Sequence, residues 1–199
     1  MSGAEHSSQV DRARAILHEW VESESLRRHC QAVADSLRHF APVEGGDPDV
    51  WDAVGLLHDM DYERHPNPEQ TPTGGHPFVG VAWLREEGWS EEVCRAILSH
   101  ADYAGVERIT PLERTLYAVD ELSGFVMAVA LVRPSKSVHE VDLAAVKKKM
   151  KDKAFARAVN RDDIVRGAAE LGRPLEDMIA GVIAALQADA DRLGLAGTR

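Results

Sequence analysis

Apolar residues recur along this chain at the spacing of amphipathic helices, and nowhere with the convincing alternation of strands. Between positions 25 and 40, for example, the apolar positions follow one another every three or four residues, as on one face of a helix. They are Leu26, Cys30, Val33, Leu37 and Phe40. A similar stripe runs through residues 174–193, and we find no internal repeat. The pattern predicts an all-α bundle.

Capping residues and helix breakers place the expected helices. Asp47-Pro48 is typical of an N-cap and first helical residue, Thr110 and Glu113 form a capping box, and Gly172 ends a helix that Asn160 begins. A run of apolar residues from 125 to 132 predicts a central helix that is buried all round. The expected helical segments are 10–21, 25–40 with Ser25 as its N-cap, 48–58, 77–87, 91–100, 111–132, a lysine-rich helix including 147–153, 161–171 and 174–193.

We expect three parts along the chain. Residues 1–8 are predicted to be a disordered tail, residues 9–132 the helical core, and residues 133–195 a C-terminal helical extension packed on that core. Between two core helices, Glu63 to Gly75 is rich in proline and glycine. Loops of this length are often functional, so it is either a lid over a site or a solvated connector.

Composition restricts the compartment and the partners. The chain has 199 residues, is 44% hydrophobic and carries a formal net charge of −10. Such an acidic chain does not bind nucleic-acid polymers or membrane surfaces broadly, although a local basic pocket remains compatible with a small anion. Without a signal peptide or a long apolar run we expect a cytoplasmic protein. The two cysteines, Cys30 and Cys94, are expected to be buried free thiols.

Histidines and aspartates fall at the inner faces or ends of successive helices. Metal sites are commonly built where such positions meet in a bundle core, and imidazole with carboxylate suits Mn, Fe, Co, Ni or Zn. Six ligands suit two metals that share a carboxylate, and Asp59 is the natural bridge because its neighbour His58 must serve one metal. Taken singly, these positions favour a structural explanation: a buried, satisfied histidine at 29 and a helix C-terminus at 58–59. The expected ligands are His29, His58, Asp59, His76, His100 and Asp120.

In combination these residues resemble the HD-domain superfamily of metal-dependent phosphohydrolases. The signature H…HD…D is matched by His29, His58-Asp59 and Asp120, and the additional His76 and His100 match the six-ligand pattern of binuclear members. The resemblance covers about residues 10–130, and its details are similar to a subgroup of hydrolases without a named substrate. It implies a helical bundle with the metals at its centre, and it adds Mg to the candidate metals.

The resemblance implies that a hydroxide between two divalent metals attacks a phosphate ester or anhydride of a small, nucleotide-like or otherwise phosphorylated metabolite. Asp59 bridges the metals in this hypothesis, while Asp61 and Asp102 either orient water and protonate the leaving group or only support the ligands. A dinucleoside polyphosphate is one candidate substrate, because HD-type tetraphosphate hydrolases have a similar order of ligands. However, the sequence DELSGF, which begins at Asp120, differs from theirs. Some six-ligand members instead hold a mixed-valent di-iron centre and activate oxygen, and a domain that only binds a ligand is a third reading.

A group of basic residues follows the expected core. Arg133, Lys136, Lys149 and Lys153 are candidates for a clamp on the phosphate of the substrate, and a solvated helix face is the alternative. The sequence leaves the oligomeric state open, a homodimer included.

Overall fold

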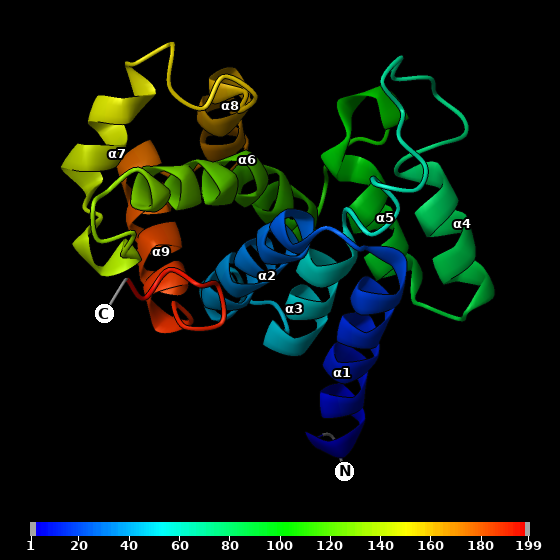
Figure 1. The fold of residues 1–199 in the computed structure, drawn as a ribbon. Coiled ribbons are helices and arrows are strands. Elements are labelled where there is room, and N and C mark those ends of the chain that lie inside the picture. Colours follow the sequence, from blue (N-terminus) through cyan, green and yellow to red (C-terminus); the bar gives the residue numbers. More distant parts are fainter. Residues whose placement is uncertain (1–2, 198–199) are drawn as a thin grey trace. The chain divides into compact units, whose positions relative to one another are not determined.

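The computed structural model describes residues 3–197, with side chains from residue 9, and within this range every regular element is helical (Figure 1). The all-α prediction is confirmed. No strand occurs among the described residues, where a single isolated bridge pairs Ser137 with Ala196. The elements are α1 (Gly3–Trp20), α2 (Glu24–Glu44), α3 (Pro48–Leu57), α4 (Phe78–Glu86), α5 (Glu91–His100), η1 (Asp102–Ala104), α6 (Pro111–Leu131), η2 (Val138–Glu140), α7 (Leu143–Met150), α8 (Arg161–Leu171) and α9 (Leu175–Ala188).

Several helix ends lie where the capping residues predict them. The Asp47 carboxylate accepts a hydrogen bond from the backbone N–H of Asp49 at 2.9 Å and begins α3. At α6 the capping box is reciprocal: Glu113 N–H donates to Thr110 Oγ1 at 3.3 Å, and Thr110 N–H donates to Glu113 Oε2 at 2.9 Å. These local hydrogen bonds satisfy N–H groups that have no partner within the helix, which is why the sequence reveals them.

The first two helices differ from the expectation at their ends. α1 already begins at Gly3, so the predicted tail is helical from there, and residues 1 and 2 lie outside the described range. The sequence pattern did not predict helix over residues 3–9 because these residues carry no apolar stripe. The cap of α2 is Ser23, not Ser25: its hydroxyl accepts from Leu26 N–H at 3.4 Å. α2 was expected to end at residue 40 but continues to Glu44. Pro42 does not stop it, because a proline in the last turn removes only one backbone hydrogen bond.

Later helices end earlier than expected, or are less buried. The apolar run at the end of α6 is not buried throughout, since Leu131 and Val132 are exposed. α7 stops at Met150, so Lys151 and the following residues form turns, and α9 stops at Ala188.

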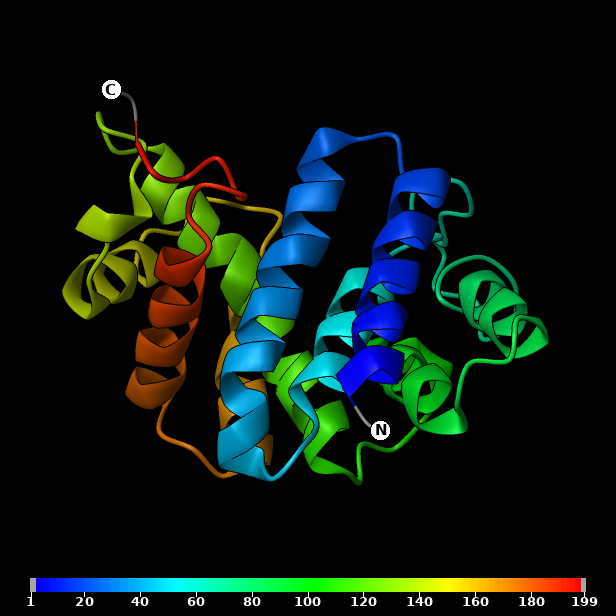
Figure 2. The same cartoon turned by 90° about the horizontal axis from the view of Figure 1, so that it is seen from below.

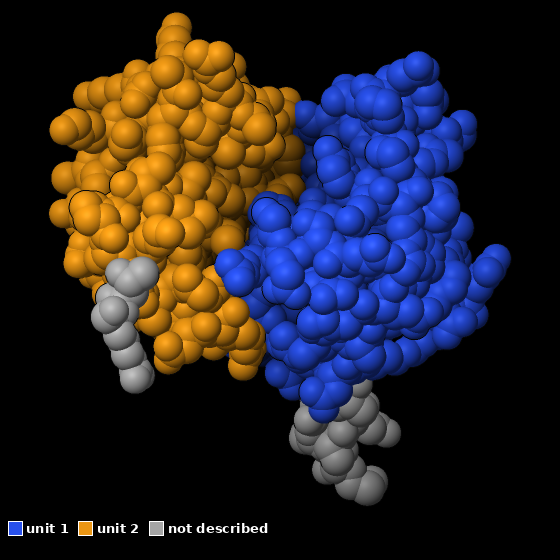
Figure 3. Space-filling view, in the orientation of Figure 1, with its two compact units in different colours: residues 1–116 blue, residues 117–199 orange. Residues whose placement is uncertain are grey.

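The chain divides into two compact units, residues 1–116 and 117–199 (Figure 3). The division falls inside α6, whereas the sequence suggested a boundary near Arg133. α6 therefore begins in the first unit and continues into the second. Each unit has its own set of buried apolar side chains.

In the first unit, α3 packs against both α1 and α2 (Figure 2), and α4 lies beside α5 (Figure 1). α2 and α3 approach very closely at Gly55, where a Cβ atom would lie 2.4 Å from Ala34 Cα. Only glycine permits this backbone contact, which fixes α3 against the helix that carries His29.

In the second unit, α9 packs against α7, α8 and η2. Its buried face contains the stripe that the sequence identified: Met178, Ile179, Val182, Ile183 and Leu186. A close contact also joins α6 and α8, where a Cβ atom on Gly167 would lie 2.6 Å from Ala118 Cα.

Candidate metal centre

His58 and Asp59 lie at the point where α3 ends. His58 is the C-cap, and the chain turns immediately afterwards, with Tyr62 N–H donating to Asp59 O at 3.0 Å. In a continuous helix, neighbouring side chains differ by about 100° in direction. The turn brings His58 Nε2 within 3.6 Å of the Asp59 carboxylate. His58 is fully buried and Asp59 is largely so.

The two oxygens of Asp59 face two different pairs of histidines. Oδ1 lies 3.4 Å from His76 Nε2 and 3.5 Å from His100 Nε2. Oδ2 lies 3.6 Å from His58 Nε2 and 3.8 Å from His29 Nε2. All five residues belong to the first unit, and their side chains come from α2, the end of α3, the residue before Pro77, and the end of α5.

The spacing within the Asp59–His76–His100 group fits the coordination shell of a metal ion. The Nε2 atoms of His76 and His100 lie 3.2 Å apart, and each lies within 3.5 Å of Asp59 Oδ1. Two nitrogen ligands bound about 2.0–2.1 Å from one metal, at octahedral to tetrahedral angles, are about 2.9–3.4 Å apart. These three residues therefore form a candidate metal group without rearrangement.

Hydrogen bonds on the far side of the rings leave Nε2 as the atom that faces the centre. His58 Nδ1 lies 2.8 Å from the carbonyl oxygen of Gly55, and His100 Nδ1 contacts the carbonyl oxygen of Ile97. A carbonyl oxygen can only accept, so these Nδ1 atoms carry the proton and the Nε2 atoms carry a lone pair. Metal-binding histidines in proteins almost always have such a partner.

The His76 ring is held by a carboxylate instead. Its Nδ1 lies 2.7 Å from Oδ1 of Asp61, which is 1% exposed. The other oxygen of Asp61 accepts the backbone N–H of Gly80 at 2.6 Å. With both oxygens engaged in this way, Asp61 is placed to support His76, which favours the second of its two expected roles. Gly80 is the glycine of the sequence HPFVG. A Cβ atom at this position would lie only 2.9 Å from Asp61 Cγ, so a larger residue would clash with the Asp61 side chain.

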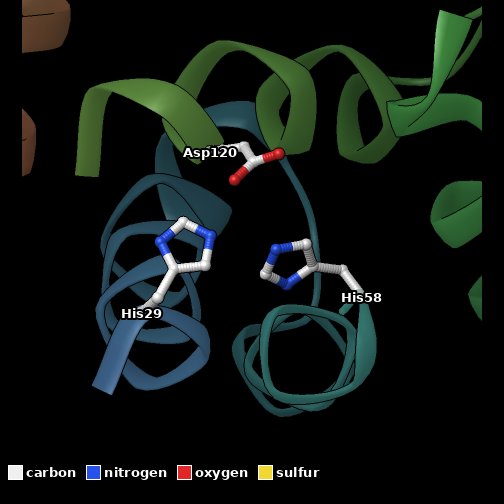
Figure 4. Close-up of side chains that lie close together, drawn as sticks. All are labelled: His29, His58 and Asp120. Atoms are coloured by element: carbon white, nitrogen blue, oxygen red, sulfur yellow. The ribbon is translucent and has the colours of Figure 1, made fainter. Parts of the chain in front are cut away.

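His29 and His58 form the other side of the centre. Their rings come from α2 and from the end of α3, with centroids 5.3 Å apart and planes at 61° (Figure 4). Asp120, also drawn in Figure 4, projects from the part of α6 that belongs to the second unit.

Two tyrosines near His76 were not found from the sequence. Tyr103 donates from its hydroxyl to the carbonyl oxygen of His76 at 2.9 Å, and partial burial raises the pKa of Tyr103 to about 12, with the negative charges of Asp59 and Asp61 adding to the shift. The half-exposed ring of Tyr62 stands edge-on to the His76 ring, with centroids 5.3 Å apart. No residue spacing links Tyr103 to His76, so only the fold reveals this contact.

The remaining candidates are Asp102 and the four basic residues. Asp102 is about half exposed and accepts a hydrogen bond from Arg108 at 2.9 Å. The four basic candidates all belong to the second unit, where Arg133 approaches Glu140 at 3.9 Å and Lys149 approaches Asp152 at 3.6 Å. Lys136 and Lys153 are exposed, and the phosphate clamp stays a prediction. Cys30 and Cys94 are buried, as expected.

Fold and site together define an all-helical protein with a cluster of imidazoles around one carboxylate. Residues 26–124 match the family model of the HD domain, and this segment contains all six expected ligands. The chain belongs to the HD-domain family, which is part of a superfamily of metal-dependent hydrolases and phosphohydrolases. Neither the curated proteins nor the solved structures contain a match to it. Within residues 3–197, none of the helices has the length and apolar character needed to cross a membrane.

Proposed function

We propose that this protein is a phosphohydrolase with two divalent metal ions, which cleaves a phosphate ester or anhydride of a small phosphorylated metabolite. Two such ions lower the pKa of a shared water and stabilise charge on the attacking and leaving oxygens. The ions are drawn from Mn, Fe, Co, Ni, Zn and Mg, because the donors are imidazole and carboxylate without thiolate.

A single observation carries this proposal: the oxygens of Asp59 divide four imidazoles into two pairs. A carboxylate that serves one ion has no need of histidines at both oxygens. One position would be held by His76, His100 and Asp59 Oδ1, and the other by His29, His58 and Asp59 Oδ2. The arrangement supports a bridging role for Asp59.

The chain's own residues prepare this site for binding. Hydrogen bonds to Gly55, Asp61 and Ile97 fix three of the rings with Nε2 directed inward, so little reorganisation is needed when ions bind. His58 and His76 are almost completely buried, which keeps competing water away from their nitrogens.

We further propose Asp120 as the sixth ligand, on the side of His29 and His58. The support is the order of residues in the matched family segment, in which Asp120 follows the five other expected ligands. Arg133 and Lys136 are proposed to bind the phosphate of the substrate. Charge reversal in Lys136→Glu should then weaken substrate affinity, and unchanged affinity would remove Lys136 from the proposal.

The experiment is a metal-dependent activity screen. Purified protein is stripped with chelator, its metal content is measured, and phosphate release is followed from nucleotides and other phosphate esters with Mn, Co, Mg or Ni. Asp59→Ala should abolish both bound metal and turnover. Asp52→Ala is the control, since Asp52 is even more buried than Asp59 but pairs with Arg38 at 3.1 Å and has no expected role in the centre.

Other results would redirect the assignment. Retained turnover in Asp59→Ala would refute the centre. Bound iron with oxygen consumption, and no phosphate release, would favour the di-iron oxygenase reading. A metal-free protein that is indifferent to chelators would favour a domain that only binds a ligand.

A further inference from the structure

The buried carboxylate of Asp61 distinguishes His76 from His58 and His100. His58 and His100 direct Nδ1 to backbone carbonyl oxygens, whereas His76 directs Nδ1 to a carboxylate 2.7 Å away. We propose that Asp61 is a positioning residue, which fixes the proton of His76 on Nδ1 and so presents Nε2 to the Asp59–His76–His100 position. This inference rests on the proposed metal centre.

The bonding capacity of Asp61 leads to this assignment. Its Oδ2 already accepts the N–H of Gly80 at 2.6 Å, so its Oδ1 is the oxygen left to contact His76. An ionised carboxylate has only acceptor sites. His76 Nδ1 must therefore be the donor, and a neutral ring that carries its proton on Nδ1 has its lone pair on Nε2, facing His100 and Asp59.

Three hydrogen bonds hold the backbone of His76 in place. His76 N–H donates to His65 O at 2.6 Å, and the carbonyl oxygen of His76 accepts from Asn67 Nδ2 at 3.0 Å and from Tyr103 at 2.9 Å. With the main chain fixed by three hydrogen bonds, the contact to Asp61 decides the ring orientation. The missing side chain at Gly80 leaves the space that Asp61 occupies.

A carboxylate partner also makes the two metal positions unequal. Donation to a charged acceptor raises the basicity of the imidazole more than donation to a neutral carbonyl, and loss of such partners typically weakens metal binding by about 10–100-fold. We therefore expect the loss of Asp61 to weaken the position held by His76 and His100, and to spare the one held by His29 and His58.

The decisive variant is Asp61→Asn, which keeps the shape of the side chain. Its amide oxygen can still accept from Gly80 N–H, while its amide N–H₂ now faces His76 Nδ1. His76 must then become the acceptor at Nδ1 and carry its proton on Nε2, which blocks that metal position. A residue with a merely structural role would change stability without moving this proton.

The proton position is read directly by ¹⁵N NMR of histidine-labelled full-length protein after chelator treatment, with His76 assigned by the loss of its signals in His76→Gln. The wild type should show the proton on Nδ1, and Asp61→Asn should show it on Nε2. In a Mn²⁺ titration followed by electron paramagnetic resonance, the variant should have one site weakened about 10–100-fold. Asp52→Asn, the buried control, should match the wild type in both measurements even if its melting temperature falls.

The inference is overturned if wild-type His76 carries its proton on Nε2, or if Asp61→Asn keeps both the wild-type proton position and the wild-type Mn²⁺ affinity. If Asp61→Asn does not fold, the wild-type spectrum alone decides. A wild type that binds no metal, yet has the predicted proton on Nδ1, would count against the proposed function and for the role of Asp61 in fixing the ring. Two normal Mn²⁺ sites in Asp61→Asn would count against the inference and leave the proposed function intact.

Discussion

The Nε2 atoms of His76 and His100 face each other at 3.2 Å, while Nδ1 of each ring points to an acceptor. With the proton of each ring on Nδ1, as proposed for His76, the two Nε2 lone pairs repel each other at this distance, and the Asp59 carboxylate adds a third acceptor within 3.5 Å. A cation between them converts this repulsion into coordination. The metal-free protein should consequently be less stable than the metal-bound one.

Metal binding is expected to raise the melting temperature. An ion that binds only the folded chain adds about 2.7 kcal/mol at a free concentration 100 times its Kd. Differential scanning calorimetry of chelator-treated protein, with and without Mn²⁺, measures the shift. Asp59→Asn should respond weakly, and an identical response in that variant would contradict the coordination of metal by Asp59.

Gly55→Ala should destabilise the protein and disturb the centre. The new Cβ would lie 2.4 Å from Ala34 Cα, a backbone atom that cannot move aside, so α2 and α3 must separate. Overpacking of this kind typically costs about 1–3 kcal/mol. Chemical denaturation measures the loss of stability, and Mn²⁺ titration measures the expected weakening as His29 moves away from His58.

Ala53→Gly in the same helix is the control for Gly55→Ala. It removes a buried methyl group and some helix propensity, so it also destabilises, but it does not push the helices apart. Its Mn²⁺ affinity should stay near that of the wild type. Equal loss of affinity in both variants would mean that global stability, and not helix spacing, governs binding.

Gly80→Ala tests the space reserved for Asp61. Alanine normally stabilises a helix by about 0.5–1 kcal/mol relative to glycine. Here its Cβ would lie 2.9 Å from Asp61 Cγ, so we expect the clash to dominate and the free energy of unfolding to fall. In an Asp61→Ala background the same change should become neutral or stabilising, which a double-mutant cycle measures. Additive effects would contradict direct coupling of the two residues.

Glu63 gives an expected dependence of stability on pH. Its carboxylate accepts hydrogen bonds from the backbone N–H groups of Glu22 at 2.8 Å and Ser23 at 3.2 Å, which lower the pKa of Glu63 below its ordinary value of 4.5. Because the pKa is lowered in the folded state, this contribution is present above the ordinary value and is lost as the pH falls through the folded one.

Glu63→Gln should therefore be less stable than the wild type at neutral pH, and the difference should shrink in acid, where Glu63 is protonated. Urea denaturation across this range measures it. Glu69→Gln removes an exposed charge from the same loop and serves as the control. A difference between Glu63→Gln and wild type that does not change with pH would contradict the role of the ionised carboxylate.

The sequence predicted those features that depend on neighbouring residues. The caps at Asp47 and Thr110 act through hydrogen bonds two or three residues away, and the buried stripe of α9 follows from helical periodicity. At the start of α2, Ser23 and Ser25 are both residues that favour an N-cap. The prediction of Ser25 was wrong, because Ser23 is the cap. The exposure of Leu131 and Val132 was also missed, because hydropathy indicates a preference for burial and not what covers a residue.

At the site, residue type and order suggested which side chains would meet, but not their hydrogen bonds. The supporting role of Asp61 depends on Gly80, nineteen positions later, and on the absence of a side chain there. Nothing local distinguishes Asp61 from Asp102, since each follows a histidine by a few residues. Only the fold buries Asp61, where its oxygens contact Gly80 N–H and His76 Nδ1, and leaves Asp102 about half exposed beside Arg108.

The central claim, that Asp59 lies between two metal ions, is tested most directly by anomalous diffraction from crystals grown with Mn²⁺. We predict two anomalous peaks, one bound by His76, His100 and Asp59 Oδ1, and the other by His29, His58 and Asp59 Oδ2. A single peak that leaves one histidine pair without metal, or no peak beside Asp59 at saturating Mn²⁺, would contradict the account.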